Sequence, residues 1–253
     1  MSDKLKSIGF ALILCLVCSF MLTAASTRLK PYQTLNIRTD RKKNILKAIG
    51  LIDRGKGYDV ETIDRMYAKH IFKFTVDKTG TITDKQTKSQ TEHDDALPLY
   101  LAIDKENKIR SYIIPIETRG LWGKIYGYMA LKKDGSTIDG FTVYKHSETP
   151  GLGGEIENSW FQKNFVGKKI VDANNNFVSI SIAKGKASDQ IDKNHLPNYV
   201  DGISGATLTG SYLTRGLQKI LSEYEPISLR FRQDILQCRM QKDIPWCENE
   251  KEK

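Results

Sequence analysis

The stretch Asp201-Gly202-Ile203-Ser204-Gly205-Ala206-Thr207-Leu208-Thr209-Gly210 is a turn of small residues that runs directly into a helical pattern. Apolar side chains recur at Leu208, Tyr212, Leu213, Leu217, Ile220, Leu221 and Tyr224. These spacings place them on one face of a helix, so the turn lies at the helix N-terminus. Unpaired backbone N–H groups and the positive end of the helix dipole collect there. The stretch therefore suits a phosphate or another anion.

The turn also combines small residues with hydroxyl groups. Gly205 and Ala206 allow an anion to approach the backbone closely, and Ser204, Thr207 and Thr209 add three hydroxyls within six residues. A helix capped by a serine after a glycine turn has the same appearance. These residues alone therefore leave a purely structural interpretation open.

The order of residues in this turn resembles the flavinylation motif of the FMN-binding domain family. In that motif an Asp, a Ser or Thr, a Gly and an Ala precede an acceptor Thr, whose hydroxyl holds FMN by a phosphoester bond. The resemblance implies that Thr207 is the attachment residue and that Ser204, Gly205 and Ala206 contact the cofactor.

A second informative stretch is His146-Ser147-Glu148-Thr149-Pro150-Gly151-Leu152-Gly153-Gly154. Pro150 pushes the preceding residue toward an extended conformation, and the glycines that follow are not explained by helix or strand propensity. A mobile loop is the alternative. The stretch is similar to the His-x-Glu-Thr-Pro-Gly-Leu-Gly loop of the same family. We therefore expect Glu148 and Thr149 to bond the flavin or its ribityl chain, and the backbone of Leu152 and Gly153 to contact the ring.

Four β-rich runs precede this loop and are separated by turn signals. They cover residues 99–103, 111–116, 125–131 and 138–144. The pattern predicts an antiparallel meander. Trp122 lies in one of the turns, between Gly120 and Gly123. Its ring is either a half-buried core residue or a wall of the flavin pocket.

The N-terminal part of the chain contains an uncharged run from Ile8 to Ala25. Eighteen residues are long enough to cross a bilayer, near the lower limit. The run predicts a transmembrane anchor over residues 8–25 after a cytoplasmic tail of residues 1–7. A removed signal peptide is the competing interpretation, because Thr23-Ala24-Ala25-Ser26 resembles a cleavage site. The run is longer than the usual signal core, which favours an anchor that is retained.

Charge and resemblance disagree about the orientation of this anchor. From Arg28 to Lys56 there are nine Lys and Arg residues against two Asp residues, so the positive-inside rule places the large domain in the cytoplasm. The family resemblance places it on the outer side of the membrane. Long domains are translocated largely regardless of their charge. We therefore expect a single-pass protein of the bacterial inner (cytoplasmic) membrane with its large domain on the periplasmic side.

Residues 26–95 are expected to form a juxtamembrane helical segment followed by a loop. Apolar spacing predicts helices at residues 40–53 and 60–71, and polar composition predicts a hairpin and loop over residues 77–95. His70 lies on the second helix and His93 in the loop. We expect His70 to be interfacial rather than a ligand, because no pattern with metal-ligand spacing accompanies it.

The remainder of an FMN-binding domain is expected over residues 96–224. A short helix at residues 155–165 is predicted to bury Trp160 and Phe161, and residues 177–183 alternate as a strand. A charged tail, residues 225–253, follows the last helix. Cys238 and Cys247 in this tail form a disulfide if the domain is extracytoplasmic, although two cysteines are weak support for one.

Residues 41–51 and 120–128 are similar to the family of the C subunit of the sodium-translocating NADH:quinone oxidoreductase, and the resemblance covers roughly residues 1–224. It implies an α+β fold in which a single N-terminal transmembrane helix precedes an antiparallel sheet flanked by helices. It also implies a flavoprotein subunit that carries covalent FMN and relays electrons within a membrane-bound respiratory complex that reduces ubiquinone.

The same resemblance implies the partners of the chain. They are the other subunits of the complex, the membrane and a flavin transferase that acts during maturation. No nucleic-acid partner is expected, and no catalytic acid, base or nucleophile is required. No spacing in the chain suggests a zinc or iron–sulfur site. Two alternatives stay open. The first is the G subunit of the Rnf electron-transport complex, and the second is a membrane-anchored scaffold without a redox role.

Overall fold

The structure, a computed structural model, describes residues 3–53, 55–83, 96–104, 106 and 108–233. The chain divides into two compact units, Met1–Arg41 and Lys42–Lys253. The predicted positions His93, Cys238 and Cys247 lie outside the described residues.

The first unit is helical. Helix α1, Asp3–Ala48, runs through it and ends inside the second unit. Its apolar window has a mean hydropathy of 2.5 and no buried residue, so α1 is long and apolar enough to cross a membrane. The helix predicted at residues 40–53 is not a separate element, because it is the end of α1. No Gly or Pro interrupts residues 32–49, so the backbone has no reason to leave the helical conformation before Gly50.

The second unit is built on an antiparallel sheet with the strand order β2-β1-β3-β4-β5-β6. The strands are β1, Ile71–Val76; β2, Ile82–Thr83; β3, Leu97–Ile103; β4, Ile109–Arg119; β5, Lys124–Lys132; and β6, Ile138–Lys145. β3 pairs with β4, β4 with β5 and β5 with β6. The predicted meander is therefore confirmed, and β1 extends it beyond the sequence expectation.

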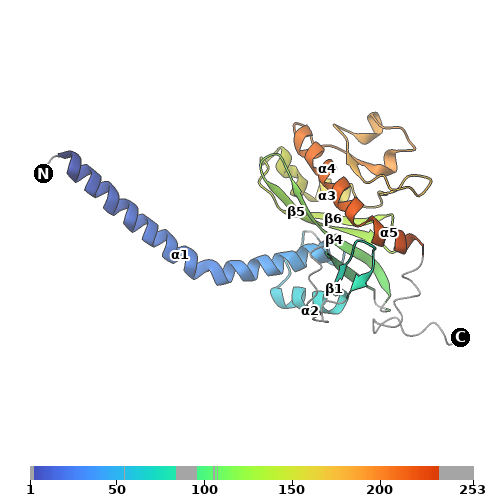
Figure 1. The fold of residues 1–253 in the computed structure, drawn as a ribbon, viewed down its shortest axis with the longest axis horizontal. Coiled ribbons are helices and arrows are strands. Elements are labelled where there is room, and N and C mark those ends of the chain that lie inside the picture. Colours follow the sequence, from blue (N-terminus) through green and yellow to red (C-terminus); the bar gives the residue numbers. More distant parts are fainter. Residues whose placement is uncertain (1–2, 54, 84–95, 105, 107, 234–253) are drawn as a thin grey trace. The chain divides into compact units, whose positions relative to one another are not determined.

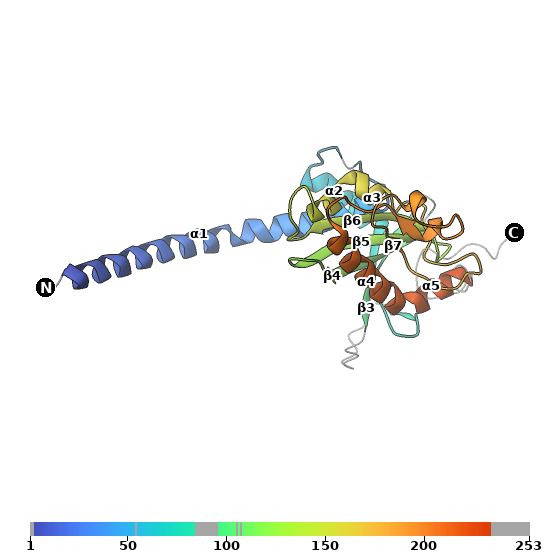
Figure 2. The ribbon, with the colours of Figure 1, turned by 90° about the horizontal axis from the view of Figure 1, so that it is seen from above.

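The two faces of the sheet carry separate apolar clusters. One face packs against α4, Thr207–Glu223, and α5, Glu225–Arg232, through side chains such as Leu213, Leu217 and Phe231. The other face packs against the last turns of α1 and against α2, Val60–His70. Figures 1 and 2 show α4 and α5 together along the sheet. The acceptor turn therefore lies on the α4 face.

The segment between β6 and α4 is irregular. It contains the helices η1, Gly153–Glu157; α3, Ser159–Lys163; η2, Ala187–Asp189; and η3, Leu196–Asn198, and the strands β7, Ser181–Ile182, and β8, Tyr199–Val200. The predicted strand at residues 177–183 is thus reduced to β7. Phe161 is buried as predicted, but Trp160 is 46% exposed, because neighbouring side chains on a helix point in different directions.

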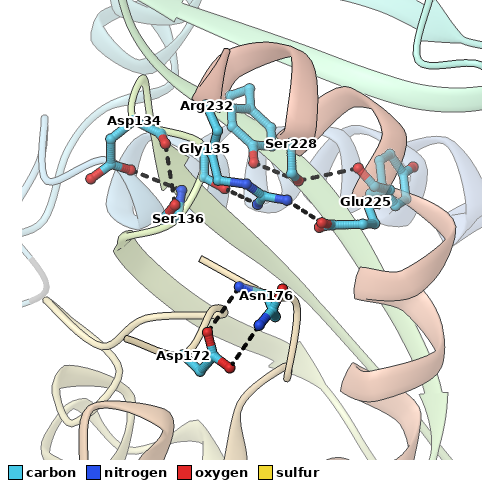
Figure 3. A network of polar contacts seen from close by, with 10 residues as sticks. Asp134, Gly135, Ser136, Asp172, Asn176, Glu225, Ser228 and Arg232 are labelled. Atoms are coloured by element: carbon cyan, nitrogen blue, oxygen red, sulfur yellow. Dashed lines mark hydrogen bonds and ion pairs between the residues drawn. The ribbon is translucent and has the colours of Figure 1, made fainter. Parts of the chain in front are cut away.

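The chain does not leave the folded unit after α4. In α5, Ile227, Ser228 and Phe231 are buried, and the Phe231 ring stacks on Tyr112 of β4 with centroids 4.5 Å apart. Figure 3 shows the polar contacts around this helix. The Tyr112 hydroxyl donates to Ser228 Oγ at 2.7 Å, and the Arg232 guanidinium contacts both the Gly135 carbonyl and the Glu225 carboxylate. The segment 225–232, expected to be tail, is part of the core.

Candidate functional site

The acceptor turn ends where α4 begins. Gly205 has φ +73°, a conformation that favours glycine, and Thr207 is the first residue of α4. No described side chain caps this helix, and its first turn holds no acidic residue. The N-terminal N–H groups and the positive end of the helix dipole therefore face an open surface that favours an anion.

The two threonines of the first turn have opposite surroundings. The side chain of Thr207 is exposed. Thr209 is 2% exposed, and its hydroxyl donates a hydrogen bond of 2.6 Å to Oε2 of Glu148. Of these two hydroxyls, only that of Thr207 is accessible to a reagent from solution.

A neighbouring loop is locked to the acceptor turn. The Ala187 N–H donates to Asp201 Oδ1 at 2.7 Å, and the Gly202 N–H donates to the Gly185 carbonyl at 2.8 Å. A Cβ atom at Gly202 would lie 2.0 Å from the Ala183 carbonyl oxygen, so the close approach requires glycine. Asp201, the first residue of the predicted motif, thus fixes the position of the turn.

Glu148 connects the glycine loop to two other segments. It is only 4% exposed, and its Oε1 accepts a hydrogen bond of 3.0 Å from the Trp122 N–H while its Oε2 accepts the Thr209 hydroxyl. The turn between β4 and β5, the loop after β6 and the first turn of α4 are therefore joined through one carboxylate. Sequence reasoning does not foresee this contact, because Glu148 and Thr209 lie 61 positions apart.

His146 supports the backbone of the same loop. Its Nδ1 accepts a hydrogen bond of 3.1 Å from the Glu148 N–H, and its Nε2 lies 3.1 Å from Glu157 Oε2. Because Nδ1 accepts, the neutral ring must carry its proton on Nε2, which then donates to Glu157. The role of His146 was not predicted from the sequence.

The acceptor turn and the two segments joined to it carry exposed apolar side chains. Trp122 is 69% exposed, and Leu152 and Leu208 are also exposed. A Cβ atom at Gly205 would lie 2.8 Å from Leu152 Cδ2, so the glycine loop lies directly against the acceptor turn. Of the two interpretations of Trp122, the half-buried core residue is wrong. The indole instead lines a surface hollow of about 550 Å³ formed by residues 117–119 and 121–124.

The residues brought together here fit the chemistry of FMN. An exposed hydroxyl and an uncapped helix N-terminus suit its phosphate, and exposed Trp and Leu side chains nearby suit a flat aromatic ring. Among the part of the chain that the structure describes, no cluster of three His, Cys, Asp or Glu side chains has the arrangement of a metal site.

Known proteins similar to this chain belong to one domain family and to one kind of subunit. The FMN-binding domain family matches residues 120–222. The C subunit of the Na(+)-translocating NADH-quinone reductase from Haemophilus ducreyi is 34% identical over 216 residues, which cover 78% of this chain and 81% of the relative. The corresponding C subunit from Pseudomonas aeruginosa is 33% identical over 245 residues, covering 85% and 89%.

A solved structure with a similar fold is the same kind of subunit as these relatives. The crystal structure of the C subunit of the Na(+)-translocating NADH-quinone reductase from Parabacteroides distasonis superposes with a TM-score of 0.65 at 28% identity, covering 79% of this chain and 96% of that one. The predicted α+β fold is thereby confirmed. The chain belongs to the family formed by the C subunit of the Na(+)-translocating NADH-quinone reductase.

Proposed function

We propose that the chain is a membrane-anchored flavoprotein subunit of the Na(+)-translocating NADH-quinone reductase that carries FMN in phosphoester linkage to Thr207. The observation that carries the proposal is the exposed Thr207 hydroxyl at the uncapped N-terminus of α4, within the turn that resembles a flavinylation motif. Bound FMN supplies the redox chemistry, because it accepts electrons and passes them on.

The protein contributes attachment, position and electrostatics. The helix N-terminus favours the charge of the phosphodiester, and Ser204, Gly205 and Ala206 form the turn next to it. We infer that Trp122 and the loop residues Glu148, Thr149, Leu152 and Gly153 form the surroundings of the ring and ribityl chain. No side chain of the site has to act as an acid or base.

The surroundings of the two threonines in the first turn of α4 indicate which of them is the attachment residue. The Thr209 hydroxyl is buried and already donates to Glu148, so a transferase would have to open the site to reach it. Thr207 is exposed and directly follows two small residues. These facts support Thr207 as the acceptor of the flavin phosphate.

We propose that α1 anchors the chain in the cytoplasmic membrane over residues 8–25, with the domain from residue 96 to residue 224 on the outer side. The apolar window of α1, in which no residue is buried, supports the anchor. The other subunits of the reductase and a flavin transferase are the proposed partners. The relatives argue against the G subunit of an Rnf complex, because they are C subunits of the Na(+)-translocating NADH-quinone reductase. A scaffold without a redox role is the remaining alternative.

The test is covalent flavin on the purified chain. The full-length protein is produced in a host with and without a flavin transferase and run on a denaturing gel under blue light. A fluorescent band is expected with the transferase, together with a mass increase that corresponds to FMN. Thr207→Val removes the nucleophilic oxygen at nearly constant shape and should give a dark band. A dark band from the unchanged chain in the presence of the transferase would favour the scaffold.

A further inference from the structure

We propose that Glu148 is a positioning residue that holds the Trp122 loop against the first turn of α4, and so fixes the indole next to the flavin. The effect on the flavin rests on the function proposed above, whereas the effect on Trp122 does not. In this proposal Glu148 acts on the flavin through Trp122 and not as a direct ligand of the cofactor, because both of its oxygens accept hydrogen bonds from the protein.

The hydrogen bonds of the carboxylate carry this inference. Glu148 is buried, and each of its oxygens accepts from a different segment, Oε1 from the Trp122 N–H at 3.0 Å and Oε2 from the Thr209 hydroxyl at 2.6 Å. Both donors are neutral groups. Hydrogen bonds to a charged acceptor are stronger than those between neutral groups, and a buried partner left unpaired is costly. The two bonds therefore restrain both segments.

The glycines around Glu148 show that the contact is built into the fold. A Cβ atom at Gly120 would lie 2.5 Å from Glu148 Oε1, and one at Gly153 would lie 2.4 Å from the Thr209 hydroxyl oxygen and 2.9 Å from Glu148 Oε2. These distances are shorter than a real Cβ contact allows. The absence of side chains at these two positions is what lets the carboxylate reach both donors.

The restraint is transmitted to the indole through the backbone of a short turn. The Gly120 N–H donates to the Gly123 carbonyl at 2.6 Å, which closes the turn that carries Trp122. The Trp122 N–H inside this turn is held by Glu148, while its indole is 69% exposed. An exposed ring is not oriented by core packing, so the backbone bond to Glu148 acts by fixing the turn from which the indole projects.

The first experiment measures amide hydrogen exchange at Trp122 in the full-length chain carrying Thr207→Val, which excludes any effect of flavin. Glu148→Ala should raise the exchange rate about tenfold or more, because the acceptor is lost. In Glu148→Gln the Trp122 exchange rate should stay close to that of the parent chain. The glutamine amide oxygen can accept from the Trp122 N–H while its NH2 group donates to the Thr209 oxygen. Glu155→Gln is the matched control, because it changes a partly exposed carboxylate in the same loop region that accepts from Asn158 and Trp160 and not from Trp122.

Thr209 provides an independent arm if Glu148→Ala fails to fold. Thr209→Val should raise the Trp122 exchange rate, because the carboxylate loses its second anchor, and Thr209→Ser should restore the parent rate. An unchanged rate in Thr209→Val, or an equal increase in Glu148→Gln and Glu148→Ala, would overturn the positioning role.

The second experiment uses the flavinylated full-length chain and the lifetime of flavin fluorescence, which an adjacent indole shortens. Glu148→Ala and Trp122→Phe should each lengthen the lifetime, and the double variant should match Trp122→Phe alone, since the two residues act as one unit. If Glu148→Ala lengthens the lifetime further in the Trp122→Phe background, Glu148 acts on the flavin directly and the proposal is wrong. If the parent chain carries no covalent flavin, the proposed function is refuted. The exchange experiment remains valid in that case, because it uses a chain without flavin.

Discussion

Thr207 and Thr209 illustrate how two nearby positions on one helix can have opposite surroundings. Residues two apart in a helix do not share a face. Thr207 accordingly faces outward, whereas Thr209 faces inward and donates to Glu148. Sequence reasoning presents the two hydroxyls as similar, and the difference in burial separates them.

At this scale we predict that Thr207→Val abolishes the flavin mass increment and that Thr209→Val retains it, in intact-mass spectra of chains produced with the transferase. Thr209→Val should also lower the free energy of unfolding by about 1–3 kcal/mol, because the buried Glu148 carboxylate loses a donor. Loss of the increment only in Thr209→Val would refute the attachment site.

At the scale of elements, α5 is the part of the fold that sequence reasoning places incorrectly. Its eight residues mix charged and apolar side chains, and the chain that follows is strongly charged. A segment this short has too few apolar positions for a periodic pattern to be recognised. Its burial depends on Tyr112 and on the loop that holds Gly135, both far away in the sequence.

We predict that Phe231→Ala costs about 3–5 kcal/mol of unfolding free energy, because a fully buried ring stacked on Tyr112 is replaced by a cavity. Leu229→Ala is the matched control on the same helix, since Leu229 is exposed and should change stability by less than about 0.5 kcal/mol. Urea unfolding of both variants measures the difference. An effect of Phe231→Ala as small as that of Leu229→Ala would show that α5 contributes little to the core.

The turn between β5 and β6 makes the stability of the fold depend on pH through the carboxylate of Asp134. Burial alone would raise the pKa of Asp134, but hydrogen bonds from the Thr137 side chain and from the Thr137 and Ser136 N–H groups outweigh it and hold the pKa below its ordinary value. The stabilising contribution is therefore complete above the ordinary pKa of 3.8 and is lost as the pH falls through the lower folded value.

Asp134→Asn should accordingly be less stable than the parent at neutral pH, and the difference between the two should shrink as the pH falls below about 4. Thermal unfolding followed between pH 7 and about pH 2 tests this. A difference that stays constant across that range would mean that the carboxylate contributes nothing through its charge.

The elements that sequence patterns do predict are those governed by local periodicity. The β-rich runs of β3 to β6, the amphipathic helix α2 and the small-residue turn before α4 are encoded within a few neighbouring residues. Contacts between segments that lie far apart in the sequence are not predicted by local patterns. Neither the Glu148 bonds to Trp122 and Thr209 nor the choice between Trp160 and Phe161 for the core has a signal in local spacing.

At the scale of the whole molecule, the chain combines an apolar helix with a folded unit that starts at Lys42. Nine basic residues against two acidic ones between Arg28 and Lys56 favour a cytoplasmic domain, whereas family resemblance favours the outer side. We predict that a reporter active only outside the cytoplasmic membrane, fused after Lys253, is active. A fusion that works only with a cytoplasmic reporter would show that charge determines the orientation.

The exposure of Thr207 in the folded unit also bears on the order of events during biogenesis. A hydroxyl accessible at the start of a formed helix can be modified after the domain has folded, so no unfolded precursor has to be captured. If Thr207 is the attachment residue, as proposed, flavin loading is a late step that is separable in time from synthesis and membrane insertion. Chains that accumulate without the transferase would form a folded reserve, ready to become fluorescent when the enzyme is supplied.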